Sequence, residues 1–307
     1  MNRLAGIIVA ALGFVIAVLS ILKVLPGLTQ AGVMMLVLGG LIIGLSFVDG
    51  PEKDETERMS TPSTLLNIFF SPSEVFQNLR RHPRWLVAAL VMGIMSATYS
   101  NLFMHQLTPE RVTNYAIDKS KEISFLNDEA RNQIEAGRAD AIAQARDPIV
   151  RVGQAITGFG WAVIGFSFLA IIFFLFALAM GGKINWWQAF SVAVYAAFPI
   201  AVIRFILNTT ILFIKDPTDI HPITGQSSLI QDNLSFLVTA SDNPVIYTFL
   251  STLSLLSIYW VWLNATGLKN AGERVSGSIG WTASLVIYGV LILLAVVSAF
   301  LFPGFIS

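Results

Sequence analysis

Seven long apolar stretches, nearly free of charged residues, alternate along the 307-residue chain with polar segments. The hydrocarbon core of a bilayer is about 30 Å thick, so a helix that spans it needs roughly 20 mostly apolar residues. The pattern therefore predicts an all-α, polytopic helical membrane protein with about seven transmembrane helices. The predicted spans are Leu4–Val24, Gly32–Val48, Trp85–Met104, Ala155–Met180, Trp187–Ile214, Val245–Leu268 and Ile279–Leu301.

These spans divide the chain into three zones. Residues 1–48 are expected to form a two-span hairpin. Residues 49–64 are charged and rich in Pro, Ser and Thr, a composition typical of a disordered linker. Residues 65–307 hold the other five spans and are expected to form one membrane domain. In the hairpin, Gly40 and Gly44 put small residues on one helix face, which would let another helix approach closely.

The polar insert at 105–154 is predicted to be helical. Thr108 followed by Pro109 is typical of a capped helix start. Apolar residues then recur at three-, four- or seven-residue spacing, which indicates an amphipathic helix or helix pair. Asn127 is placed to cap a second helix, which would end at Asp147. Two interpretations are open: a helical hairpin packed on the outer face of the bundle, or a docking platform for another protein.

A shorter amphipathic helix is predicted just before the third span. Ser71 and Glu74 have the spacing of a capping box, in which each side chain accepts a hydrogen bond from the other residue's backbone N–H. The helix would lie at the cytoplasmic membrane surface, or it would pack beneath the bundle as an elbow into the third span. Its apolar face carries Val75, Phe76 and Leu79, and its polar face carries Gln77, Asn78, Arg80 and Arg81.

Composition limits the chemistry that the chain can perform. Hydrophobic residues make up 55% of it and charged residues 12%, whereas a soluble domain has about a quarter charged residues. The 19 basic and 19 acidic side chains cancel, so no bulk attraction to nucleic acid is expected. The lack of cysteine excludes disulfides, thiolate metal sites and cysteine nucleophiles. His82, His105 and His221 all lie outside the predicted spans. No catalytic residue, metal site or cofactor is therefore predicted.

Basic residues in short loops indicate how the chain is oriented in the membrane. They precede spans 1 and 3 and fill the loops between spans 4 and 5 and between spans 6 and 7, which places these segments in the cytoplasm. The N-terminus is then inside and the C-terminus outside. The insert at 105–154 would lie outside although it carries seven basic residues, so its side of the membrane is left open. The orienting residues are Arg3, Arg80, Arg81, Arg84, Lys183, Lys269 and Arg274.

The fifth span is the most polar one. A charge near the middle of a bilayer costs at least ~2.5–3.5 kcal/mol, which makes Arg204 a candidate for a functional site. Alternatively, the span breaks at Pro199 and Arg204 extends towards the headgroup layer as an anchor. The candidate ligand- or lipid-binding residues are Arg204, Asn208, Thr209, Thr210 and Asn264.

Four short motifs follow one another in the second zone. They are FSPSEVF at 70–76 with PRW at 83–85, GGK at 181–183, WQAFSVAVYAAFP at 187–199 and WVWLNATGL at 260–268. In this order and spacing they resemble the Yip-domain family (Ypt-interacting protein one) in its bacterial form, over roughly residues 65–302.

This resemblance implies a five-helix membrane domain with a cytoplasmic N-terminal segment, here in a bacterial cytoplasmic membrane. Eukaryotic relatives act in vesicle traffic and associate with Rab-type GTPases and with each other, and some bacterial relatives are encoded beside ABC-type exporters. The family supplies no established catalytic residues. This chain departs from the eukaryotic pattern in its N-terminal hairpin, its long insert and its lack of a long cytoplasmic N-terminal region. The lack of that N-terminal region argues against binding of a small GTPase.

Two functions are consistent with these features of the sequence. The first is a non-enzymatic membrane scaffold or accessory protein that acts through helix packing and partner binding, in membrane traffic or organisation or beside an exporter complex. Its partners would be membrane lipids, a second copy of the chain, or a membrane protein such as an ABC-type exporter. The alternative is a transporter or channel for a lipid or small solute that uses the polar cluster around Arg204. An intramembrane protease would need a Ser–His or Asp–Asp pair, and the spans contain no histidine or acidic residue.

Overall fold

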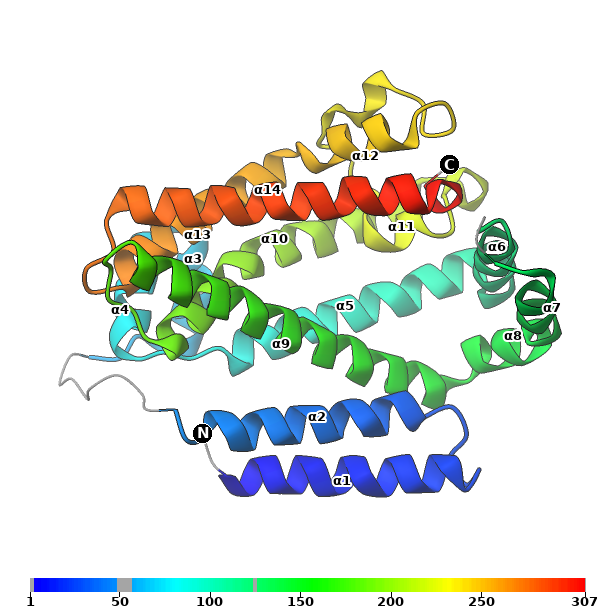
Figure 1. The fold of residues 1–307 in the computed structure, drawn as a ribbon, viewed down its shortest axis with the longest axis horizontal. Helices are drawn as coiled ribbons and strands as arrows, with labels where there is room; N and C mark the ends of the chain where they lie inside the picture. Colours follow the sequence, from blue (N-terminus) through cyan, green and yellow to red (C-terminus); the bar gives the residue numbers. More distant parts are fainter. Residues whose placement is uncertain (1–2, 49–56, 124–125, 307) are drawn as a thin grey trace. The chain divides into compact units, whose positions relative to one another are not determined.

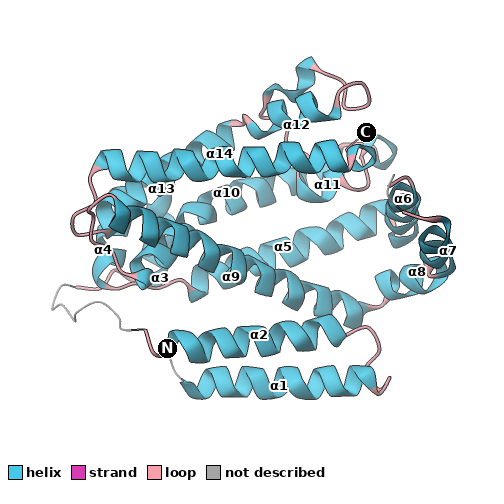
Figure 2. Ribbon diagram, viewed as in Figure 1, coloured by secondary structure: helices cyan, strands magenta, loops and turns pink. Residues whose placement is uncertain are grey.

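The computed structural model describes residues 3–48, 57–123 and 126–306. Within these ranges the chain is built of α-helices and short 3-10 turns without a β-strand, as Figure 2 shows, which confirms the predicted all-α class. The chain divides into two compact units. Unit 1 comprises Met1–Ile94, Asp147–Pro199 and Leu263–Ala283, and unit 2 comprises Met95–Arg146, Ile200–Trp262 and Ser284–Ser307.

Each unit contains helices of its own, and four further helices have residues in both units. Figure 1 labels the helices along the chain. Unit 1 contains α1 (Arg3–Ile21), α2 (Thr29–Leu45), α3 (Thr61–Phe70), α4 (Pro72–Arg81) and α9 (Pro148–Ala179). Unit 2 contains α6 (Pro109–Lys121), α7 (Asp128–Ala136), α8 (Arg138–Arg146), α11 (Thr224–Ser227), α12 (Pro244–Thr252) and the 3-10 turns η1 (Pro217–Asp219), η2 (Leu234–Leu237) and η3 (Pro303–Phe305). The four shared helices are α5 (Leu86–Leu107), α10 (Trp186–Ile214), α13 (Leu255–Ala271) and α14 (Gly277–Leu301).

Five helices in the described part of the chain, α1, α5, α9, α10 and α14, are long and apolar enough to cross a membrane. The apolar helix α2 is shorter, with 17 residues. The predicted count of seven spans is therefore not confirmed, although a multi-pass arrangement is. The suggested break at Pro199 is wrong, because α10 continues through this residue. Proline is tolerated inside transmembrane helices where neighbouring groups satisfy the freed carbonyl.

The predicted sixth span, Val245–Leu268, is not one helix. It is divided into α12 and α13, and the chain leaves the helical path at Leu253 and Ser254. Asp232, more than 20 residues earlier, stabilises this break. Its carboxylate accepts a hydrogen bond from Leu256 N–H at 3.0 Å and its carbonyl accepts one from Leu255 N–H at 3.2 Å. The new helix start thus obtains acceptors that a continuous helix would not need.

The N-terminal hairpin is held by close contact between α1 and α2. A Cβ atom added at Gly39 would lie 2.5 Å from Ala10 N, and one added at Gly32 would lie 2.5 Å from Ala17 N. By contrast, nothing lies within 4 Å of a Cβ added at Gly40 or Gly44. Small residues thus bring the two helices together at Gly32 and Gly39, whereas Gly40 and Gly44 point away from α1, and the close approach of another helix to their face stays a prediction.

The polar insert is helical, and its predicted caps are present. Thr108 Oγ1 accepts a hydrogen bond from Arg111 N–H at the start of α6, and Asn127 Oδ1 accepts one from Ala130 N–H at the start of α7. The segment continues into a third helix, α8. Asp147 then caps α9, which begins seven residues before the predicted fourth span.

The predicted linker, 49–64, has a helical end. Ser60 Oγ accepts a hydrogen bond from Ser63 N–H, and α3 starts at Thr61. Pro62 lies in the first turn of α3, a position where its missing N–H costs nothing. The prediction of disorder for residues 49–56 lies outside the described residues.

Candidate functional site

The polar residues predicted on the fifth span lie on α10 and face different ways. Arg204 and Thr210 are exposed, and the Thr210 hydroxyl donates to a carbonyl of its own helix. Asn208 is only 3% exposed, and its Oδ1 accepts a hydrogen bond from Leu229 N–H at 2.8 Å. The Thr209 hydroxyl is buried and has no hydrogen-bond partner among the described residues. Asn208 therefore holds the loop after α11, while Arg204 remains available to the surroundings.

Asn264, the fifth candidate, is fully buried on α13 and belongs to unit 1, whereas the other four residues belong to unit 2. The structure thus brings four of the five candidates onto one stretch of α10, divided between exposed and buried positions. A ligand-binding role for this group stays a prediction.

In unit 2, the insert is tied to the segment that follows α10. The guanidinium of Arg111 on α6 donates hydrogen bonds to three carbonyl oxygens in the segment 217–220. Tyr115, one turn later, lies with its hydroxyl 3.0 Å from Nε2 of His221. Because a guanidinium carries five N–H donors in a fixed plane, one arginine can serve three acceptors. Sequence reasoning missed Arg111, because nothing in its neighbourhood distinguishes it from other basic residues of an amphipathic helix.

Replacing Arg111 by glutamine is expected to destabilise unit 2 by about 1.5 kcal/mol, the lower end for hydrogen bonds to a charged group, since this side chain is partly exposed and water replaces part of the loss. Hydrogen exchange in the 217–230 segment should rise in the purified chain. Arg146→Gln is the matched control, because Arg146 lies in the same insert and makes an exposed ion pair with Glu110. Equal exchange in both variants would contradict the structural role of Arg111.

The predicted helix at 71–81 is α4, and its apolar face is covered by protein. Val75, Phe76 and Leu79 have no exposed surface. The predicted capping box is wrong, because the Ser71 side chain makes no capping hydrogen bond at the start of α4. Ser71 also ends α3, where its N–H donates to Asn67 O, and its backbone (φ −136°, ψ 57°) departs from the extended conformation of a normal N-cap.

A capping box does form at the start of α10, where sequence reasoning did not look for it. Asn185 Oδ1 accepts from Gln188 N–H at 2.8 Å, and Gln188 Oε1 accepts from Asn185 N–H at 2.9 Å. The amide nitrogen of Gln188 donates to the carbonyl of Arg80 at 2.8 Å, which fixes the end of α4 against α10. The N-x-x-Q spacing was a visible signal. Of the charged residues of α4, Glu74 and Arg81 are exposed, and Arg80 is partly buried.

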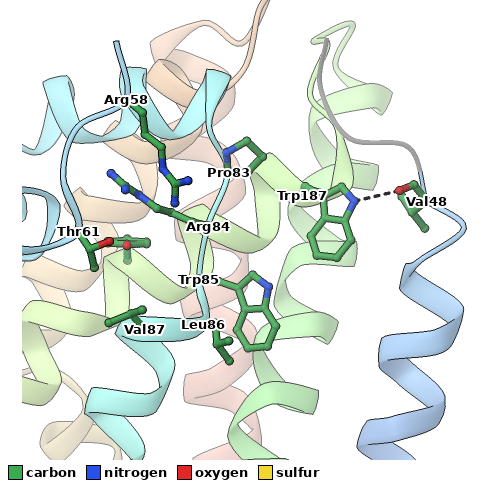
Figure 3. Close-up of a pocket in the computed structure, with 10 residues that line it drawn as sticks. Val48, Arg58, Thr61, Pro83, Arg84, Trp85, Leu86, Val87 and Trp187 are labelled. Carbon is green, nitrogen blue, oxygen red and sulfur yellow. Dashed lines mark hydrogen bonds between the residues drawn. The ribbon is translucent and has the colours of Figure 1, made fainter. Parts of the chain in front are cut away.

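Unit 1 also contains a pocket of about 380 Å³ at the start of α5, here named the Arg84 pocket (Figure 3). Arg58 and Arg84 line it together with Thr61 and Tyr195, and the remaining wall is mostly apolar. Trp187, on that wall, donates its indole N–H to Val48 O at 3.2 Å. The other lining residues are Pro83, Trp85, Leu86 and Val87.

Arg84 is the most constrained side chain of this pocket. Its Nη2 donates to the hydroxyl of Thr64, a fully buried residue of α3, and lies 3.5 Å from Asn78 Oδ1. Its Nε is buried and has no hydrogen-bond partner among the described residues. Burial lowers the pKa of Arg84 below its usual value; the interaction with Tyr195 opposes this effect, and the positive charge of Arg58 adds to it. The protein therefore holds a guanidinium where its charge is poorly compensated.

These elements define a multi-pass helical membrane protein in which buried polar groups such as Gln188 and Asn208 connect one helix or loop to another. The Yip1 domain family is matched over residues 66–300, which include α4, Arg84 and the capped start of α10, whereas Arg58 and Thr61 of the pocket precede the matched range. The chain belongs to this family, as the four sequence motifs predicted. No curated protein and no solved structure was found to match the chain. The Yip1 domain is not known as an enzyme family.

Proposed function

We propose that this chain is a non-enzymatic scaffold or accessory protein of the membrane, and that the insert of unit 2 is its docking surface for another membrane protein. The observation that carries the proposal is the construction of the insert. Its helices α7 and α8 have no buried residue, yet both are positioned by contacts with α6. A platform that is ordered but uncovered suits a partner-binding role better than a packing role.

Ion pairs hold these helices in place. Arg138 on α8 reaches Asp118 on α6 at 2.5 Å and Glu135 on α7 at 2.8 Å, and Lys121 on α6 reaches Glu135 at 2.7 Å. Hydrogen bonds from Arg138 and Lys121 lower the pKa of Glu135 to about 2. Single surface ion pairs contribute little, but here two basic side chains share one carboxylate in a network that joins three helices.

Single cysteines provide the test, because the natural chain has none. Gln133→Cys on α7 and Asp140→Cys on α8 replace exposed residues that make none of these ion pairs. A photoactivatable maleimide at these positions, used in native membranes, should give a discrete adduct larger than the monomer. Ser241→Cys, in the exposed loop before α12, is the control and should give monomer. Monomer alone from both insert positions would contradict the proposal.

The same variants test the proposed orientation, with the N-terminus in and the C-terminus out. If the sequence-predicted spans are counted as crossings, with Val245–Leu268 as the sixth, the insert and Ser241 lie outside and Ser278, at the start of α14, lies inside. A membrane-impermeant maleimide added to intact cells should therefore label Gln133→Cys and Ser241→Cys but not Ser278→Cys. If only Ser278→Cys is labelled, the orientation is the opposite of the one proposed.

A further inference from the structure

The Arg84 pocket contains positive charge that the described residues leave uncompensated. Of its lining residues, two are arginines and none is acidic. Arg58 is exposed and makes no ion pair with another described residue, and Arg84 Nε is buried without an acceptor. A buried donor without a partner is destabilising, and more so when it belongs to a charged group. An anion in this pocket would supply the missing acceptor.

The geometry around the two arginines suits a phosphate group. In Figure 3 the guanidinium groups of Arg58 and Arg84 lie on the same side of the pocket, close to Thr61. Guanidinium N–H groups form planar, paired hydrogen bonds with phosphate oxygens, and a threonine hydroxyl can donate a further one. At about 380 Å³ the pocket lies at the small end of the range of ligand sites, about 300–1,000 Å³.

The opposite wall favours an amphiphile over a free ion. Trp85, Leu86 and Val87 lead into α5, one of the helices that are long and apolar enough to span the membrane. Leu86 is 50% exposed and Val87 is 45% exposed, so apolar surface continues from the pocket onto the outside of the helix. An acyl chain could follow this surface while its headgroup lies between the arginines. Tryptophan is enriched at this depth of a membrane, where an apolar body and a polar N–H are both satisfied.

We propose that the Arg84 pocket binds the phosphate group of an anionic phospholipid, with Arg58 and Arg84 as its ligands and the start of α5 as the guide for an acyl chain. The site is independent of the docking role proposed for the insert, which belongs to unit 2.

Binding is measured on the purified full-length chain by native mass spectrometry and by the shift in melting temperature. The probes are phosphatidylglycerol, diacylglycerol with the same acyl chains, and inorganic phosphate. Arg58→Gln should weaken binding of phosphatidylglycerol about tenfold, the value of one charge-assisted hydrogen bond. Arg84→Lys keeps the charge but loses the planar pair of donors, and it should weaken binding by at least as much. Arg81→Gln, an exposed neighbour that does not line the pocket, should leave binding unchanged.

Phosphatidylglycerol that binds in preference to diacylglycerol, and that Arg58→Gln weakens, supports the proposal. Inorganic phosphate that binds as tightly as the lipid, with the same dependence on Arg58, supports a phosphate site but overturns the lipid as its source. Equal binding of diacylglycerol and phosphatidylglycerol overturns the proposal, and so does lipid binding that Arg58→Gln leaves unchanged. Because Arg84 also contacts α3, Arg58→Gln decides the result if Arg84→Lys fails to fold.

Discussion

Replacing Phe76 by alanine should lower the free energy of unfolding by about 3–5 kcal/mol, the range for truncating a buried aromatic side chain. Phe76 is among the largest fully buried side chains of the described residues, and its ring lies so close to α13 that a Cβ added at Gly267 would be 3.0 Å away. The aromatic ring fills the space that the glycine leaves. Alanine would leave a cavity there that the rigid helices cannot close fully. Thermal unfolding of the purified chain, monitored by size-exclusion chromatography, measures the loss of stability.

Phe70 offers a matched control for this experiment. It is the same residue type six positions earlier, at the end of α3, and it is 82% exposed. Phe70→Ala should change the stability by no more than about 0.5 kcal/mol, as is usual for surface positions. If the two variants lose equal stability, α4 does not pack through its apolar face as described.

The apolar face of α4 could be predicted from the sequence because it depends only on spacing. Val75, Phe76 and Leu79 recur at helical intervals, and all three are buried. What covers this face could not be predicted, because the partner Gly267 is almost 200 residues away. Two interpretations, a membrane surface and an elbow beneath the bundle, both fit the same pattern of residues, and spacing alone cannot separate them.

Helix ends likewise depend partly on neighbouring residues, which the sequence shows directly, and partly on distant residues, which it does not. The sequence predicted Thr108 and Asn127 as caps, and both accept the expected backbone hydrogen bond, although Thr108 directly follows the end of α5. Ser71 has the same local signature, but its backbone (φ −136°, ψ 57°) also ends α3, and its side chain makes no capping hydrogen bond. The break between α12 and α13 depends on Asp232, which no window of neighbouring residues would include.

The candidate site was the least predictable part. Arg204 could be predicted as a candidate from the sequence alone, because a charge within an apolar span is unusual. The sequence gives no reason to pair Arg58 with Arg84, because they lie 26 positions apart in polar surroundings. Only the fold places both at one pocket and leaves a buried N–H of Arg84 without an acceptor.

Gly39→Val should separate α1 from α2, at a cost of at least about 3 kcal/mol, the upper end for overpacking. The added Cβ would lie 2.5 Å from Ala10 N and 2.7 Å from Gly6 O, and these are backbone atoms that no rotamer change can move. In a membrane, helix association depends on such close packing, because lipid tails are as apolar as the side chains they would replace. Hydrogen exchange of the α1 backbone, together with the melting temperature, should report the separation.

Gly40→Val makes the same chemical change one residue later, where nothing lies within 4 Å of the added Cβ. The two variants share the effect of valine on helix propensity, so the difference between them measures packing alone. Gly40→Val should therefore leave hydrogen exchange in α1 unchanged. If Gly40→Val raises hydrogen exchange in α1 as much as Gly39→Val does, the effect comes from losing a flexible glycine. The close small-residue contact at Gly39 is then not what holds the hairpin together. The chosen pair thus distinguishes which of two adjacent glycines faces α1, a question that composition and spacing leave open because the rotation of a helix depends on its partner.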